Sequence, residues 1–368
     1  MGLDDPLTRW IAIGVAVVAT VALVVCWRGL ARRGFLAVLG RSVALLGVNV
    51  SVLMAVFLVV NAQFGLFSDW ADLLGTQQVV TTTQASGSAS GSATAQASEA
   101  APVRLDGYDG RVWRAQVPGP RSGTTAEALV VLPTGYGTTP APAGGYPVIE
   151  AFHGYPGTPE QWLDAMHLLP SLDAAVTAHQ LAASVVVIPT LEVPAGRDTE
   201  CVDGGDGQPK LETWLSQDVP DYVEQHYTVS RQARSWATIG LSMGGWCANE
   251  MAMLHPDRFS AAIAFGGYSR LDLGSWKPFS ADSPPAKRYD LVALAKQNPP
   301  AVRLWALASK EDGLSWPSTQ ALASAVHGPT TMTLVTQQQG GHRTSIWAGI
   351  VPQALTWLGS APGFAPAT

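Results

Sequence analysis

Two long apolar segments lie at the start of the chain, and we predict that both are transmembrane helices, at about residues 10–27 and 42–60. Residues 11–26 contain only apolar and small side chains. A helix needs about 20 such residues to cross a bilayer, so either segment is long enough once its flanks are counted. Asn49 is the strongly polar residue inside the second segment. It could bond to the first helix, but we expect it simply to be tolerated.

The charges around these segments predict their orientation. Four arginines lie between or at the edge of the two segments: Arg28, Arg32, Arg33 and Arg41. Short loops rich in arginine stay in the cytoplasm, so both ends of the pair should face outward. A cleaved signal peptide is the first alternative, but the chain opens with Asp4 and Asp5 in place of a basic region, and a second span follows. A buried helix pair in a soluble protein is the second alternative.

The stretch from Thr76 to Pro102 predicts a flexible linker. It reads TQQVVTTTQASGSASGSATAQASEAAP and contains a single charged residue, Glu99. Its 27 residues would hold the following domain roughly 30 Å from the membrane anchor. We therefore divide the chain into an anchor (residues 1–75), a linker (76–102) and an extracytoplasmic domain (103–368).

The third part alternates between short apolar runs and helical patterns. The expected strands cover 128–133, 147–152, 184–189, 236–240, 261–265, 303–308 and 331–335. The expected helices begin at Thr158, where Thr158 and Gln161 would form a capping box, and cover 211–227, 246–255, 316–326 and 345–358. This alternation predicts an α/β fold, a mostly parallel sheet with helices on both faces.

One pentapeptide predicts nucleophilic chemistry. Gly240-Leu241-Ser242-Met243-Gly244 has the form GxSxG and lies between an expected strand and an expected helix. In that context the serine sits on a sharp turn that exposes its hydroxyl group, which makes Ser242 the candidate nucleophile. The GxSxG pattern alone is weak evidence in a chain rich in glycine. Its position between an expected strand and an expected helix makes it strong evidence for a nucleophile.

A seryl nucleophile needs a base, which in this arrangement follows it along the chain. Of the three later histidines, His255 follows a helix in HPDRF and His327 lies in a loop. His342, in QGGHRTS after the last expected strand, fits best, because Gly340 and Gly341 allow a tight loop over the edge of the sheet.

The acid that orients the base should follow the preceding strand. That strand ends at Glu311 and Asp312, side by side. We favour Asp312, because an Asp-Gly step turns the chain immediately after the carboxylate. Glu311 is the alternative, since its longer side chain could reach the same imidazole.

Two backbone N–H groups are candidates for an oxyanion hole. They belong to Tyr155, in the glycine-rich loop HGYPG, and to Met243, which follows the nucleophile. His153 precedes the nucleophile, and we expect it to brace this loop instead of acting as a base. Cys201 and Cys247 both fall outside the membrane in this topology and could form a disulfide beside the site.

Composition excludes several other functions. The chain has 22 basic and 28 acidic residues and no basic block that could follow a phosphate backbone, so nucleic acid is an unsuitable partner. Its three cysteines show no zinc-site spacing, and we predict no metal and no cofactor. Only five of the basic residues are lysine, which favours a bacterial genome rich in G and C. A hydrophobic content of 47% and a mean hydropathy of +0.15 fit a chain that lies partly in lipid.

The motifs GLSMGG, HGYPG, KED and GGH, in this order over residues 103–360, resemble the esterase group of α/β-hydrolases that includes esterase D and the secreted mycolyltransferases. The resemblance implies an α/β-hydrolase fold and an acyl-serine mechanism. Ser242, Asp312 or Glu311, and His342 take the matching catalytic positions, and Tyr155 takes the oxyanion-loop position. The charged loop with which mycolyltransferases hold a sugar is replaced here by HGYPGTPEQW.

The sequence therefore predicts a membrane-anchored serine esterase outside the cytoplasmic membrane, with the bilayer and an ester substrate, lipid-linked in our interpretation, as its partners. Acyl transfer to a lipid or sugar hydroxyl is the alternative within the same chemistry. A catalytically silent hydrolase fold that serves as a binding module is the alternative from another class.

Overall fold

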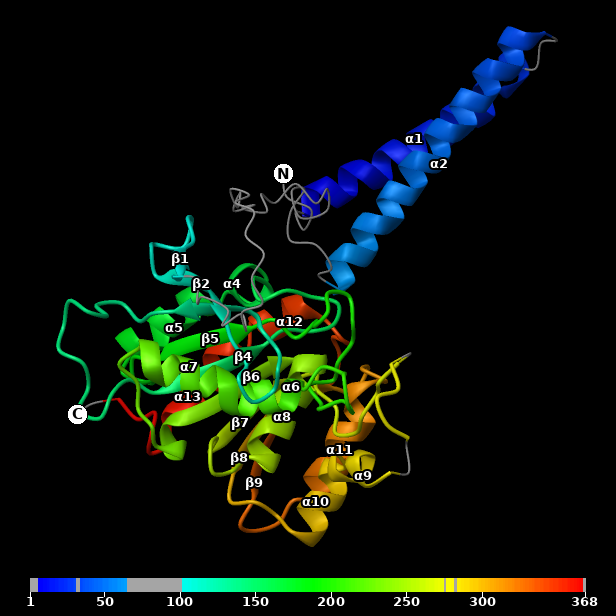
Figure 1. Cartoon of the computed structure of the whole chain (residues 1–368). Helices are drawn as coiled ribbons and strands as arrows, with labels where there is room; N and C mark the ends of the chain where they lie inside the picture. The colour runs from blue at the N-terminus through cyan, green and yellow to red at the C-terminus, as the bar shows by residue number, and fades with distance from the viewer. Residues whose placement is uncertain (1–5, 31–33, 65–100, 275, 281–282, 367–368) are drawn as a thin grey trace, which may run out of the picture. The chain divides into compact units, whose positions relative to one another are not determined.

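The computed structural model describes residues 6–30, 34–64, 101–274, 276–280 and 283–366 (Figure 1). All but the last two residues of the predicted linker lie outside this part of the chain. The chain divides into two compact units, which are described separately below: Met1–Gly91 and Ser92–Thr368.

The first unit contains two long apolar helices, α1 (Pro6–Leu30) and α2 (Phe35–Phe64). Both are long and apolar enough to cross a membrane, and their most apolar windows have mean hydropathies of 2.5 and 2.7. Only 6% and 11% of those windows are buried, whereas the core helix of a soluble protein is mostly buried. The Asn49 amide donates to the Leu45 carbonyl of its own helix (2.9 Å), so the helix accommodates it without a bond to α1.

The second unit is built on a nine-stranded sheet within the described residues, in the order β1-β2-β3-β5-β4-β6-β7-β8-β9. The strands are β1 (Val103–Arg104), β2 (Val112–Val117), β3 (Ala126–Val131), β4 (Val148–Phe152), β5 (Val185–Pro189), β6 (Trp236–Leu241), β7 (Ala261–Phe265), β8 (Arg303–Ser309) and β9 (Thr331–Gln337). From β5 across to β9 all neighbours pair in parallel, whereas β1, β2 and β3 form antiparallel pairs up to β5. The predicted mostly parallel α/β fold is confirmed.

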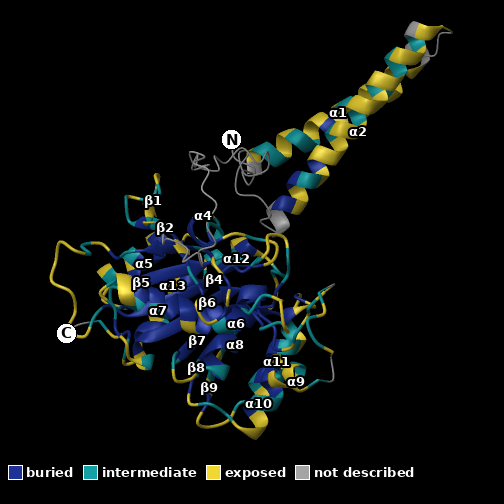
Figure 2. Ribbon diagram, viewed as in Figure 1, coloured by how far each residue is buried: buried dark blue, intermediate teal, exposed yellow. Residues whose placement is uncertain are grey.

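The parallel strands are apolar on both faces because helices cover both faces (Figure 2). In β4, Val148 packs into one core and Ile149 into the other. The first face is covered by α6 (Leu211–Thr213), the π-helical turn η1 (Trp214–Asp218), α7 (Val219–His226), α8 (Met243–Leu254), α10 (Leu291–Gln297) and α11 (Ser315–Ala325). The second is covered by α4 (Gln161–Asp164), α5 (Leu168–Thr177), α12 (Thr344–Ala348) and α13 (Val351–Gly359). The short helices η2 (Ala233–Ser235) and α9 (Pro284–Arg288) complete the unit.

One predicted local feature is wrong. The helix expected from Thr158 begins at Gln161, and no side chain caps it. The Gln161 side chain, expected to close a capping box, instead accepts a hydrogen bond from the Gly154 N–H (3.0 Å). A contact across the loop therefore replaces the local one, and it lies next to the candidate oxyanion donor Tyr155.

Candidate active site

The candidate nucleophile stands on a strained turn between β6 and α8. Ser242 has φ 55° and ψ −121°, outside the regions that a side chain tolerates comfortably, and Met243 begins α8. The turn also needs close packing, since a Cβ on Gly244 would lie 2.2 Å from the Phe152 carbonyl oxygen at the end of β4. These features are those of a nucleophile elbow at the carboxyl edge of a parallel sheet.

Three predicted side chains form one hydrogen-bonded line. His342 Nε2 lies 2.8 Å from Ser242 Oγ, and His342 Nδ1 lies 2.7 Å from Asp312 Oδ2. The imidazole also packs edge-on against Trp347, with 4.6 Å between the ring centroids. Serine, imidazole and carboxylate thus lie in the order that lets the imidazole take the serine proton while the carboxylate orients the ring.

Asp312 is buried behind the imidazole, and its surroundings favour its charged form. Burial alone would raise its pKa, but hydrogen bonds from His342 and from the Ser315 hydroxyl outweigh burial and hold the pKa of Asp312 below its ordinary value. The Ser315 N–H adds a further donor at 3.1 Å. Such a carboxylate remains ionised at neutral pH and stabilises a protonated imidazole.

The alternative acid, Glu311, is directed elsewhere. Its carboxylate accepts a hydrogen bond from the Gly340 N–H (3.0 Å), in the loop that leads to His342. That loop turns at Gly340 and Gly341, with φ of 125° and 63°. Glu311 therefore supports the loop that leads to His342, whereas Asp312 hydrogen bonds to the imidazole itself.

The structure places the two other downstream histidines away from this line. His255 Nε2 lies 2.8 Å from the Glu212 carboxylate. His327 contacts the carbonyl oxygens of Lys296 and Gly328. These contacts lie away from Ser242, whereas His342 Nε2 lies 2.8 Å from Ser242 Oγ.

The HGYPG loop, which contains the candidate donor Tyr155, lies against the candidate nucleophile Ser242. A Cβ on Gly154 would lie 3.4 Å from the Ser242 Cβ, so Gly154 packs directly against the serine. Tyr155 is the next residue of the chain. Met243 is the first residue of α8, and the N–H of such a residue has no acceptor within its helix. Met243 thus directly follows Ser242 along the chain, and Tyr155 directly follows a glycine that packs against it.

His153 braces this loop, as the sequence predicts. It is buried, and its Nδ1 donates to the Gly154 carbonyl (2.7 Å) while its Nε2 accepts from the Leu191 N–H (2.9 Å). Burial lowers the pKa of His153 to about 4, so the ring is neutral and its tautomer is fixed by these two contacts.

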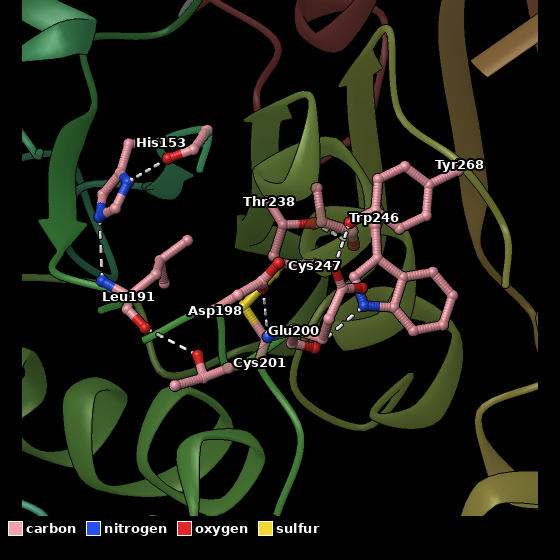
Figure 3. The surroundings of a disulfide bond; sticks show 12 residues. His153, Leu191, Asp198, Glu200, Cys201, Thr238, Trp246, Cys247 and Tyr268 are labelled. Atoms are coloured by element: carbon pink, nitrogen blue, oxygen red, sulfur yellow. Dashed lines mark hydrogen bonds between the residues drawn. A yellow bond between two sulfur atoms is a disulfide. The ribbon is translucent and has the colours of Figure 1, made fainter. Parts of the chain in front are cut away.

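A disulfide joins Cys201 to Cys247 in α8, with 5.7 Å between the Cα atoms (Figure 3). The Trp246 indole N–H donates to the Glu200 carbonyl (3.0 Å) and its ring stacks on Tyr268. The Tyr268 hydroxyl donates to the Glu200 carboxylate, and burial raises the pKa of that carboxyl. The segment before Cys201 is therefore attached to the helix that follows the nucleophile.

Sequence reasoning missed Glu192, Gln161 and Trp347, which contact the candidate site through its loops and the imidazole. Glu192 and Trp347 belong to no motif, and Gln161 has a place only in the predicted capping box, so their contacts with the site are visible only in the structure. Among the described residues, no group of three histidine, cysteine, aspartate or glutamate side chains could hold a metal ion.

The sequence matches a family described as "Putative esterase" over residues 120–350, more than half of the chain. The chain belongs to this esterase family. A protein of Corynebacterium glutamicum, itself uncharacterized, is 29% identical over 149 residues, which are 40% of this chain and 34% of that protein. The chain thus spans only about a third of the length of this relative.

Solved structures similar to this esterase-family chain share its fold at low identity. A ferulic acid esterase has 19% identity and a TM-score of 0.57, over 67% of this chain and 97% of that one. An S-formylglutathione hydrolase from Agrobacterium tumefaciens has 17% identity and a TM-score of 0.57, over 68% and 95%. MPT51 from Mycobacterium tuberculosis has 17% identity and a TM-score of 0.50, over 71% and 99%. At these identities the likeness establishes the α/β-hydrolase fold.

Proposed function

We propose that this chain is a serine esterase that cleaves carboxylic esters through an acyl-serine intermediate. The hydrogen-bonded line from Ser242 through His342 to Asp312 carries the proposal. Membership of an esterase family supports the same reaction class.

In the first step Ser242 Oγ attacks the ester carbonyl carbon while its proton passes to His342 Nε2. The carbonyl oxygen becomes an oxyanion that accepts hydrogen bonds from the Tyr155 and Met243 N–H groups. The intermediate collapses, the C–O bond to the alcohol breaks, and His342 returns the proton to the departing oxygen. Water then attacks the acyl-serine while its proton passes to His342. The carboxylic acid is released, and His342 returns the proton to Ser242 Oγ, which restores the free serine hydroxyl group.

We further propose that the enzyme is anchored in the cytoplasmic membrane by α1 and α2, with its catalytic domain outside, and that its substrate is a lipid-linked ester. The length and apolar surface of the two helices support the anchor, and the arginines between the helices support the orientation. A domain held close to a bilayer meets membrane-borne esters at a raised effective concentration. An acylated or aminoacylated envelope lipid fits this description.

The acyl-serine could also pass its acyl group to a hydroxyl in place of water. The fold likeness to MPT51 is compatible with this alternative, which resembles mycolyl transfer. Adding candidate lipid and sugar acceptors to the ester assay separates the two, because transfer produces a new ester while hydrolysis produces only free acid.

The test of the proposed function is the Ser242→Ala variant in detergent-solubilised full-length protein. Without the nucleophile we expect p-nitrophenyl acyl ester turnover to fall by at least ~10⁴-fold, leaving only the contribution of the oxyanion hole and binding. Ser360→Ala is the matched control, since this surface serine contacts Arg303 and should leave turnover unchanged. Turnover that survives Ser242→Ala rules out the proposed nucleophile.

A further inference from the structure

The loop that follows β4 is cross-linked to the segment that follows β5. The Leu191 N–H donates to His153 Nε2 (2.9 Å), and the Tyr155 hydroxyl donates to the Gly196 carbonyl oxygen (3.2 Å). Tyr155 is 39% exposed, so its hydroxyl could equally bond to water. The contact with Gly196 instead ties the side chain of a proposed oxyanion donor to the neighbouring segment.

Glu192 supplies two more cross-links with a single carboxylate. Its Oε1 accepts from the Gly157 N–H (2.8 Å), and its Oε2 accepts from the Gly196 N–H (3.0 Å). Gly157 lies two residues after Tyr155, and Gly196 accepts the Tyr155 hydroxyl. The carboxylate therefore fixes both the backbone after Tyr155 and the group that holds its side chain.

We propose that Glu192 is a positioning residue of the oxyanion hole: by binding the Gly157 and Gly196 N–H groups, it holds the Tyr155 N–H in the place where the oxyanion forms. The inference rests on the proposed serine esterase function. Glu192 does not contact the substrate in this proposal. It acts only through the loop that carries Tyr155.

The same segment is also attached to the other proposed donor. Residues 191–201 end at the disulfide from Cys201 to Cys247, and the Trp246 indole donates to the Glu200 carbonyl (3.0 Å). Both attachments lie in the first turns of α8, which begins at Met243. The segment thus joins the loop of one proposed donor to the helix of the other, and in our proposal it helps to set the spacing between the two N–H groups. Oxyanion stabilisation depends on this spacing, because donors must lie at about 2.7–3.1 Å from the oxyanion.

A carboxylate suits this role because it offers an acceptor oxygen to each of two N–H donors, and hydrogen bonds to a charged acceptor are stronger than neutral ones. A glutamine at position 192 has one acceptor oxygen, and its amide NH₂ would face the second donor. Glu192→Gln should therefore release Gly157 or Gly196 with almost no change in side-chain volume.

The experiment compares Glu192→Gln and Glu192→Ala with wild-type full-length protein on a soluble p-nitrophenyl ester. We expect kcat to fall about 10- to 100-fold with KM within about threefold, since a misplaced donor weakens transition-state binding and leaves substrate binding intact. The affinity for an aryl boronic acid, which forms a tetrahedral adduct with the serine, should fall by the same factor as kcat. Tyr155→Phe removes only the bond to Gly196 and should lower kcat by about threefold, so the idea is tested even if the Glu192 variants fail to fold.

Asp218→Asn is the matched control. Asp218 is a buried carboxylate that also bridges two loop N–H groups, those of Arg121 (3.1 Å) and Ser122 (3.0 Å), in the connection between β2 and β3. This variant should lower the melting temperature but leave kcat and boronic acid affinity unchanged in the folded fraction.

Two results would overturn the inference. One is a Glu192→Gln variant that melts earlier, as Asp218→Asn does, yet keeps the wild-type kcat, because Glu192 would then be a structural brace alone. The other is a fall in kcat without a matching fall in boronic acid affinity. A wild-type protein without ester turnover would refute the proposed function instead, and this outcome is visible before any variant is compared.

Discussion

Asp312 and Glu311 are neighbours in the sequence, but they have different roles in the structure. Asp312 is buried, bonds to His342 and has its pKa held below the ordinary value, whereas Glu311 is exposed and bonds to the Gly340 backbone. The sequence alone left both residues as candidates, because a one-residue step along a chain leaving a strand changes the direction of the side chain. The choice depends on how the turn after β8 folds.

At the residue scale we predict that Asp312→Asn lowers kcat by roughly 10³- to 10⁴-fold, because an amide cannot hold the required imidazole tautomer or stabilise its positive charge. Glu311→Gln should lower kcat by less than about tenfold, since the amide oxygen can still accept from the Gly340 N–H. Steady-state kinetics on one soluble ester measures both. An Asp312→Asn variant that is no slower than Glu311→Gln would contradict the assignment.

At the scale of elements, the continuous apolar runs along the chain predicted the positions of most strands correctly. The seven strands from β3 to β9 were predicted within about two residues, because their burial leaves little room for polar side chains. Strands β1 and β2 were missed, since β1 has only two residues and β2 carries partly exposed residues such as Arg114 and Gln116. Sequence also could not show that Gln161 and Glu192 accept hydrogen bonds from the backbone of the HGYPG loop. Glu192 is 35 residues from its partner Gly157, and Gln161 is only seven residues from Gly154 but has the position of a capping-box residue.

The disulfide is the covalent link between α8 and the segment that reaches the oxyanion loop. It closes a loop with a sequence separation of 46, for which loop-closure entropy gives a stabilisation of about 4 kcal/mol as an upper value. We predict that the double variant Cys201→Ser, Cys247→Ser unfolds at a clearly lower temperature and loses part of its kcat, because this link joins the segments that carry both proposed oxyanion donors.

Thermal melting and steady-state kinetics of the purified full-length variant check this prediction. Cys26→Ser, which changes the exposed free cysteine of α1, is the control for loss of a thiol and should behave as wild type. A double variant with the wild-type melting temperature would show that the link adds no stability.

At the scale of the whole molecule, the chain combines an apolar helix pair with an esterase-family domain. The predicted boundary at residue 75 falls outside the described residues, whereas the one at residue 102 falls inside them, directly before β1. The division into two compact units falls between Gly91 and Ser92. The helices are longer than predicted, with candidate spans over Leu7–Trp27 and Ala37–Asn61. Orientation in the membrane and the nature of the substrate remain predictions from the sequence.

If the anchor serves a lipid-linked substrate, full-length protein in liposomes should hydrolyse an ester carried by a lipid of the same liposomes at least about tenfold faster than does protein cleaved within the linker and released into solution. A soluble p-nitrophenyl ester should be hydrolysed at equal rates by both forms, because anchoring does not alter the active site. Equal rates on the lipid ester would leave simple retention at the membrane as the role of the helices.

The central claim is that Ser242, activated by His342 and oriented through Asp312, forms a covalent acyl-enzyme. The most direct measurement is labelling of folded full-length protein with a fluorophosphonate, followed by mass spectrometry of the peptide that contains GLSMGG. The account predicts one stoichiometric adduct on Ser242, a strongly reduced rate of labelling in His342→Ala, and no adduct in Ser242→Ala. Folded wild-type protein that takes up no label, or takes it up at another residue, would contradict the claim.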